Sequence, residues 1–304
     1  MNLHRVGVIG HGEVGKTFSA GLQAKPGVRT VGAWDVKFVD PATQADELAH
    51  AARLGVTAHA SLQALCEASD FIVSAVTASN TLAVAQGAAR YIRPGSVYLD
   101  LNSASPGTKQ QCAALIDAAG GHYVEAGVMT SVPPYGIRVP LLLGGVCAAE
   151  LAQRLTAWDM DAKPVSEKIG VASAMKMCRS VMIKGMEALV IESYATARHY
   201  GVEDHVLPTL EETFPSIDWQ QTGAYFFSRV VEHGKRRAEE MREAANTVRE
   251  AGFEPMMTAS TADKQQWVAD QATAGLFKHL PKDARWQDYA DALLAARGEK
   301  KSLI

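Results

Sequence analysis

The sequence predicts an α/β protein in which a doubly wound, mostly parallel sheet is followed by an all-helical C-terminal domain. Three observations support this. The first half of the 304 residues alternates short apolar runs with helical segments, a pattern typical of a parallel sheet covered on both faces. A glycine-rich turn follows the first run, and from Gly170 onward hardly a strand candidate remains. We expect the domains to cover residues 1–165 and 166–304, joined by a long helix from about Gly170.

The elements follow from apolar runs and from helix start and stop signals. The predicted strands cover residues 6–9, 28–34, 56–59, 70–76, 96–100, 122–128 and 139–143. Helices are predicted between them over 16–24, 42–54, 62–68, 81–91 and 108–119, with Ser61 as the N-cap of the third. The alternation stops near 161–164. Helices then cover 171–200, 206–213, 223–251, 260–274 and 286–296, Gly201 and Gly252 end two of them, and 298–304 is expected to be a loose tail.

The glycine-rich turn points to a dinucleotide. Gly10, Gly12 and Gly15 have the G-x-G-x-x-G spacing, after a predicted strand and before a predicted helix. In this setting the first glycine allows a tight turn, the second leaves room for a pyrophosphate, and the third lets the helix pack close to the strand. The N-terminal N–H groups of the helix then face the phosphates. The cofactor-binding residues expected here are Gly10, His11, Gly12, Glu13, Val14 and Gly15, with His11 as a spacer rather than a catalyst.

The choice of cofactor depends on Asp35, which ends the second apolar run 20 residues after Gly15 (35 − 15). A carboxylate there can accept hydrogen bonds from the adenosine ribose, and it would repel the 2′-phosphate of NADP. Asp35 therefore favours NAD, although Lys37 could partly offset its charge and leaves NADP open. The loops after later strands should lie on the same rim of this Rossmann-type domain. Further cofactor contacts are expected from Val76, Thr77 and Asn102.

The composition argues against several classes of partner. A formal net charge of −3 indicates neither nucleic acid nor an anionic membrane. No apolar run approaches the roughly 18 residues that span a bilayer, and the first predicted strand begins too early to leave room for a signal peptide. The four cysteines lie far apart without C-x-x-C spacing, so we expect reduced, mostly buried thiols and no metal site. A cytoplasmic protein that acts on a small molecule is expected.

Lys176 is the main candidate for chemistry outside the turn. It lies between two methionines in an otherwise small and apolar turn near the start of the long helix. Spacings of three and four place Arg179, Ser180 and Lys184 near the same face. A partly desolvated lysine can exchange a proton with a substrate hydroxyl near neutral pH. The residues alone also allow a plainer interpretation, namely a lysine whose stem packs at a domain junction.

The chain resembles the β-hydroxyacid dehydrogenase family, which includes 3-hydroxyisobutyrate and 6-phosphogluconate dehydrogenases. The resemblance covers the turn 10–15, the loop 99–106 (Leu-Asp-Leu-Asn-Ser-Ala-Ser-Pro) and the helix start 170–180. It implies that Ser103 is the loop hydroxyl that contacts substrate near the nicotinamide. It also implies that Lys176, counted from Gly170, is the catalytic acid/base. A homodimer built through the helical domain is expected on the same grounds.

The sequence departs from the family where the substrate would bind. Arg179-Ser180 replaces an asparagine pair after the lysine, and residues 125–131 replace the family's glycine-rich substrate loop. Arg236-Arg237 stands where the family carries a Lys-Asp pair in the helical domain. Arg179 could hold a carboxylate bidentately, or it could be a surface arginine. The expected substrate-binding residues are Ser103, Met129, Thr130, Ser131, Arg179 and Ser180.

These features together predict an NAD(P)-dependent oxidoreductase that acts on CH–OH, with NAD favoured. It would interconvert a β-hydroxy acid, or a related alcohol, and its carbonyl by hydride transfer, with Lys176 and Ser103 as catalytic residues. One alternative is an imine reductase on the same fold, although those enzymes usually carry a different residue in place of the lysine. The other is a non-catalytic NAD(P)-binding sensor, which would bind the dinucleotide and turn over nothing.

Overall fold

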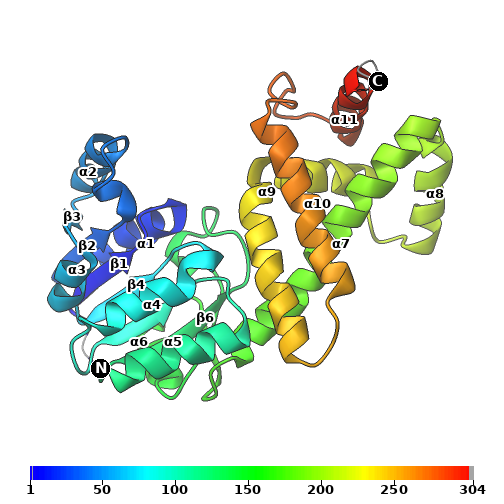
Figure 1. The fold of residues 1–304 in the computed structure, drawn as a ribbon. Helices are drawn as coiled ribbons and strands as arrows, with labels where there is room; N and C mark the ends of the chain where they lie inside the picture. Colours follow the sequence, from blue (N-terminus) through cyan, green and yellow to red (C-terminus); the bar gives the residue numbers. More distant parts are fainter. Residues whose placement is uncertain (2, 301–304) are drawn as a thin grey trace. The chain divides into compact units, whose positions relative to one another are not determined.

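The computed structural model describes residue 1 and residues 3–300, and it divides into two compact units, residues 1–178 and 179–304 (Figure 1). The boundary lies inside the long helix α7 (Val171–Tyr200), whose first turns belong to the first unit. The sequence places the boundary earlier, between 165 and 166, where the last strand of the sheet ends. The two units are described separately below.

The first unit is built on one eight-stranded sheet with the order β3-β2-β1-β4-β5-β6-β7-β8. Neighbouring strands are parallel except β6 and β7, which are antiparallel. The central strands are buried along their whole length, as expected for a sheet covered on both faces. The strands are β1 (Arg5–Ile9), β2 (Thr30–Trp34), β3 (Thr57–Ala58), β4 (Phe71–Ser74), β5 (Val97–Asp100), β6 (His122–Val128), β7 (Leu141–Gly144) and β8 (Ala162–Ser166).

The helices of this unit connect successive strands, and two buried clusters lie between helices and sheet. Ser61 caps its helix as predicted, because its hydroxyl accepts the Ala64 N–H at 3.1 Å. The α-helices are α1 (Glu13–Gln23), α2 (Gln44–Arg53), α3 (Leu62–Ala68), α4 (Thr81–Ala89), α5 (Pro106–Ala118) and α6 (Ala148–Thr156). The 3-10 turns are η1 (Val36–Phe38), η2 (Ala78–Asn80) and η3 (Gly136–Arg138).

The predicted fold class is confirmed, but the end of the sheet differs from the prediction. The alternation does not stop at 161–164, because β8 forms there and pairs with β7 after the unpredicted helix α6. Lys163 and Pro164 are exposed in β8, which therefore lacks an apolar run. A proline is tolerated there because an edge strand has one unpaired side. The thiols also differ from expectation: Cys66 and Cys112 are buried, whereas Cys147 is half-buried and Cys178 is exposed.

The second unit is helical throughout its described part. Its core packs large aromatic side chains, with the rings of Tyr194 and Trp286 in edge contact at 4.8 Å. Gly201 and Gly252 both have positive φ and end helices, as predicted. The prediction of a loose tail over 298–304 was wrong for residues 298–300, because the last helix runs to Lys300. Residues 301–304 lie outside the described residues. Besides most of α7, the helices are α8 (Glu203–Thr213), α9 (Trp219–Glu250), α10 (Met256–Thr273) and α11 (Trp286–Lys300).

One charged group of α9 lies in the core of the second unit rather than on its solvated face. Arg237 is buried and donates to both carboxylate oxygens of Glu187 on α7, with Nε 2.9 Å from Oε2. Gln265 on α10 donates to the same oxygen at 3.2 Å. A buried ion pair of this kind needs such additional hydrogen bonds to offset the cost of desolvation. No helix among the described residues is long and apolar enough for a membrane span.

Candidate functional site

The glycine turn is shaped as the sequence predicts. Gly10 has a φ of +90°, and a Cβ there would lie 2.4 Å from the carbonyl oxygen of Ala75. A Cβ on Gly15 would lie 1.7 Å from the oxygen of Gly10, so both positions exclude a side chain. A Cβ on Gly12, in contrast, would meet nothing within 4 Å. The open space therefore lies at Gly12, directly before the N-terminus of α1, where a pyrophosphate would need it. The residues fit a dinucleotide.

Asp35 is fixed against this turn by backbone donors. The N–H of His11 donates to Oδ2 at 2.6 Å, and the N–H of Lys37 donates to Oδ1 at 2.9 Å. The second bond makes Asp35 the N-cap of η1. The carboxylate is therefore held at the end of β2 beside the glycine turn, and lone pairs remain on its oxygens for ribose hydroxyls.

The side chain of His11 is buried under the turn. Its ring lies 5.3 Å from that of Phe38 and 5.8 Å from that of His50, and neither ring nitrogen has a hydrogen-bond partner among the described residues. Burial, and then the charge of Lys16, lower the pKa of His11 below its ordinary value of 6.5. His11 is thus held as a neutral ring at neutral pH. Its place in the glycine turn predicts a spacer, and the sequence carries no sign of this burial.

Asn102 links the ends of β4 and β5. Its Oδ1 accepts the N–H of Val76 at 2.7 Å, and its Nδ2 donates to the hydroxyl of Ser74 at 3.0 Å. Thr77 is exposed on the same rim, with its hydroxyl accepting from Asn80 at 2.8 Å. Two of the predicted cofactor residues, Val76 and Asn102, are therefore brought into direct contact by the fold.

A buried charge cluster, missed by the sequence analysis, supports the loop after β5. Lys109 on α5 is fully buried, with Nζ 2.9 Å from Oδ1 of Asp100. The hydroxyl of Tyr123 donates to Oδ2 of the same carboxylate at 2.6 Å, and the N–H of Asn102 donates to Oδ1 at 2.8 Å. Asp100 thus anchors the start of the loop that carries Ser103. An Asp at the end of a buried strand and a Lys nine residues later were the only signals in the sequence.

Ser103 and Lys176 are hydrogen-bonded. Nζ of Lys176 donates to Oγ of Ser103 at 2.6 Å, across 73 positions of sequence and within the first unit. Both side chains are half-buried. The two residues that the sequence proposed for proton transfer and substrate contact are therefore neighbours.

Glu125 on β6 positions the helix that carries the lysine. It is fully buried, its Oε1 accepts the N–H groups of Gly170 (2.7 Å) and Ala172 (3.1 Å), and its Oε2 accepts that of Ser173 (3.3 Å). A carboxylate at a helix N-terminus satisfies its unpaired donors and interacts favourably with its dipole. Gly127 permits the close approach, because a Cβ there would lie 3.0 Å from the oxygen of Ala172.

The predicted substrate residues lie in two places. Met129, Thr130 and Ser131 follow β6; the N–H of Met129 donates to Pro140 at 3.0 Å, and Thr130 is exposed. Arg179 and Ser180 open the second unit, the former exposed and the latter buried. Lys184, on the same helix, forms an ion pair with Glu240. No group of three metal-binding side chains is arranged for an ion in the part of the chain that the structure describes.

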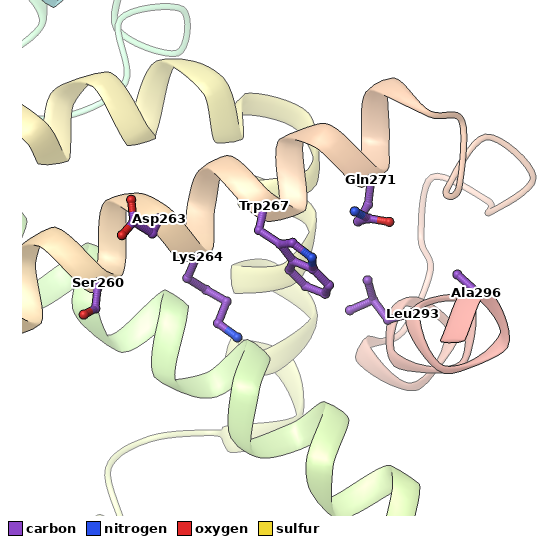
Figure 2. A pocket seen from close by; sticks show the side chains of 7 residues that line it. All are labelled: Ser260, Asp263, Lys264, Trp267, Gln271, Leu293 and Ala296. Atoms are coloured by element: carbon purple, nitrogen blue, oxygen red, sulfur yellow. The ribbon is translucent and has the colours of Figure 1, made fainter. Parts of the chain in front are cut away.

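The second unit holds a cavity of about 580 Å³ that contains none of these residues (Figure 2). Trp267 and Lys264 project from α10 toward it, and the ammonium of Lys264 lies 5.3 Å from the indole ring centre. That ammonium also pairs with Glu192 at 2.5 Å. The other lining residues are Ser260, Asp263, Gln271, Leu293 and Ala296.

Comparison with known proteins agrees with the fold and the turn. Residues 5–133 match the NAD binding domain of 6-phosphogluconate dehydrogenase, and residues 197–268 match a domain of unknown function, DUF1932. A conserved hypothetical protein of Sinorhizobium meliloti 1021 is 37% identical, with 96% of each chain covered and a TM-score of 0.75. An uncharacterized 28.5 kDa protein of Methanothermus fervidus is 28% identical over 282 residues, covering 91% of this chain and 98% of the other.

More distant structures share the fold alone. The 3-hydroxyisobutyrate dehydrogenase of Mycobacterium tuberculosis is 16% identical, with 96% of this chain and 99% of the other covered and a TM-score of 0.70. An imine reductase of Streptomyces aurantiacus is 18% identical, with 88% and 95% covered and a TM-score of 0.52.

The fold and the glycine turn define a dinucleotide-binding protein of the dehydrogenase fold class. Within that class, the chain belongs to the family that joins the NAD-binding domain of 6-phosphogluconate dehydrogenase to a DUF1932 C-terminal domain, with structural similarity to 3-hydroxyacid dehydrogenases.

Proposed function

We propose that the protein is an NAD(P)-dependent dehydrogenase that interconverts a β-hydroxy acid, or a related alcohol, and its carbonyl. The observation that supports this most directly is the 2.6 Å hydrogen bond from Lys176 to Ser103. The family resemblance assigns an acid/base lysine and a substrate-binding hydroxyl to these two positions. A non-catalytic sensor would need neither group, nor their contact.

Lys176 handles the proton in this proposal. Its amine accepts the proton of the substrate hydroxyl during oxidation and returns it during reduction. Oγ of Ser103 lies beside the same amine and holds the substrate oxygen in place for that transfer. Bound NAD(P) supplies the hydride acceptor or donor for the carbon atom. NAD is the favoured form because Asp35 carries its charge where a 2′-phosphate would lie.

The acidic end of the substrate is assigned to groups on both sides of the lysine in sequence. Met129, Thr130 and Ser131 offer backbone and hydroxyl contacts, and Arg179 offers a bidentate site for a carboxylate. Ser180 is the remaining candidate. These assignments rest on the resemblance and on the position of these residues after β6 and along α7.

The first test is NAD reduction, followed by absorbance, with a panel of aliphatic and aromatic hydroxy acids. Wild-type protein should reduce NAD with at least one of them. Lys176→Ala should lower turnover by about 100-fold or more, because general acid–base catalysis contributes on that scale. Calorimetry should show unchanged NAD binding by this variant. Lys163→Ala, which removes an exposed lysine of β8, is the matched control and should keep full activity.

The opposite result is equally informative. If wild-type protein binds NAD tightly but reduces it with no hydroxy acid, the proposed reaction is wrong. Cyclic imines tested with NADPH would then separate imine reduction from a sensor without turnover.

A further inference from the structure

Three elements around Asp35 contribute a compact set of charges. Lys16 lies on α1, Lys37 on η1 and Glu47 on α2. Nζ of Lys16 lies 2.8 Å from Oε2 of Glu47, and Nζ of Lys37 lies 3.8 Å from Oε1. One carboxylate therefore engages two ammonium groups, one through each oxygen.

This set adjoins Asp35, the residue expected to contact the adenosine ribose of the cofactor. Lys37 donates its backbone N–H to Asp35. Asp35 also accepts the backbone N–H of His11 at 2.6 Å. The charges of Lys16 and Glu47 act on the buried ring of the same histidine. Ammonium groups near Asp35 are the groups that would attract a 2′-phosphate. Here each of them faces a carboxylate instead.

Glu47 is well suited to hold both lysines. Only 14% of its side chain is exposed, compared with 48% for Lys37, so it is the fixed member of the set. The contact with Lys16 lowers the pKa of the Glu47 carboxyl, which is therefore ionised at neutral pH. The screening that weakens surface ion pairs is reduced for a carboxylate that is largely buried.

We propose that Glu47 is a cofactor-specificity residue: by pairing with Lys16 and Lys37, it withholds both ammonium groups from a 2′-phosphate and reinforces the preference for NAD that Asp35 sets. This rests on the dinucleotide-dependent function proposed above and assigns part of its selectivity to a residue outside the glycine turn and the β2 carboxylate. Asp35 acts by direct repulsion at the ribose, whereas Glu47 acts through the two lysines.

The test compares the binding of NADH and NADPH by calorimetry in wild-type protein and in Glu47→Gln, which keeps the size of the side chain and removes its charge. The affinity for NADPH should rise roughly tenfold, because two released ammonium groups act on a phosphate through partly screened Coulomb interactions. The affinity for NADH should stay within about twofold. Glu67→Gln, at an exposed position of α3, makes the same change in net charge and should leave the NADPH to NADH ratio unaltered.

Two further variants connect the effect to its cause. Glu47→Asp keeps the charge and should keep the wild-type ratio. Adding Lys37→Met to Glu47→Gln should remove a large part of the gain, since one of the released ammonium groups is then absent. Thermal unfolding of each variant verifies that it is folded.

The outcomes separate this proposal from the proposed function. If wild-type protein binds NADH and Glu47→Gln leaves the ratio unchanged, the role of Glu47 is refuted while the dinucleotide function stands. If wild-type protein binds neither dinucleotide, both proposals fail. A gain that is also seen in Glu67→Gln would show a general effect of net charge and would overturn the role of Glu47.

Discussion

Lys176 and His11 show how the same fold gives two ionisable side chains opposite surroundings. Lys176 is half-buried and donates to the hydroxyl of Ser103 at 2.6 Å. His11 is fully buried, and within the part of the chain that the structure describes both of its ring nitrogens lack hydrogen-bond partners. A buried polar ring without hydrogen bonds costs stability, and protonation would increase that cost. The lysine is therefore placed for proton transfer, and the histidine is placed to remain neutral.

His11 should make the stability of the protein depend on pH. Its pKa in the folded state lies below 6.5, because of burial and of Lys16, so the unfolded chain takes up its proton first as the pH falls. The unfolded state then binds more protons, and the free energy of unfolding decreases below about pH 6.5. Urea denaturation at about pH 7.5 and pH 5.5 should show this loss, and His11→Asn should show a smaller one.

His59 provides the comparison, since burial also lowers its pKa. His59→Asn should reduce the loss independently of His11→Asn. An unchanged pH dependence in His11→Asn would mean that protonation of this ring does not limit the stability of the folded state.

At the scale of elements, α7 is tied to the sheet through the buried carboxylate of Glu125. The first N–H groups of a helix have no acceptor within the helix itself. The carboxylate of Glu125 accepts three N–H groups at the start of α7. Glu125 therefore couples β6 to the helix that carries Lys176. From the sequence, Glu125 is expected only at the edge of the substrate loop, because nothing in the linear chain indicates which helix a buried carboxylate will cap.

Glu125→Ala should lower the free energy of unfolding by about 3 kcal/mol, since it leaves buried N–H groups unpaired. Turnover should fall by about tenfold or more in protein that is still folded, because Lys176 then loses its fixed distance from Ser103. Urea denaturation and NAD reduction measure the two effects. Glu167→Ala, at an exposed position just before α7, should change neither. Normal turnover in a destabilised Glu125→Ala protein would show that this residue does not position the lysine.

At the scale of the whole molecule, the second unit exposes apolar side chains that its own core does not cover. Met182 and Leu189 lie seven residues apart on α7. The exposed fraction is 65% for Met182 and 57% for Leu189. Residues seven apart share one face of a helix. We propose that the protein is a homodimer assembled through this unit, as the family resemblance implies.

Sedimentation equilibrium should then give twice the mass of one chain at micromolar concentration. Met182→Glu and Leu189→Glu should each weaken the dimer, since they bring a charge into an apolar interface. Because both side chains are exposed in the single chain, we expect the monomer to stay folded, which circular dichroism verifies. A monomer at every concentration would contradict the proposal.

Local patterns in this protein can be predicted from neighbouring residues alone. The glycine spacing, the carboxylate at the end of the second strand, the N-cap at Ser61 and the helix ends at Gly201 and Gly252 are all found in the structure, because each depends on a few neighbouring residues. The edge strand β8 was missed, since an exposed edge needs no apolar run. The burial of Arg237 against Glu187 could not be predicted, because helical periodicity cannot distinguish a solvated charge from a paired, buried one.

Only the tertiary structure decided which distant groups meet. Ser103 and Lys176 are 73 positions apart, and Glu125 lies 45 to 48 positions before the N–H groups that it accepts. The same holds for Lys16 and Glu47, which lie on different helices. Contacts of this kind arise from strand order and helix packing, whose energy is shared over many buried side chains and is not encoded at the contacting positions. The residue types that carry the chemistry can therefore be recognised in the sequence, whereas their assembly into one site depends on the fold.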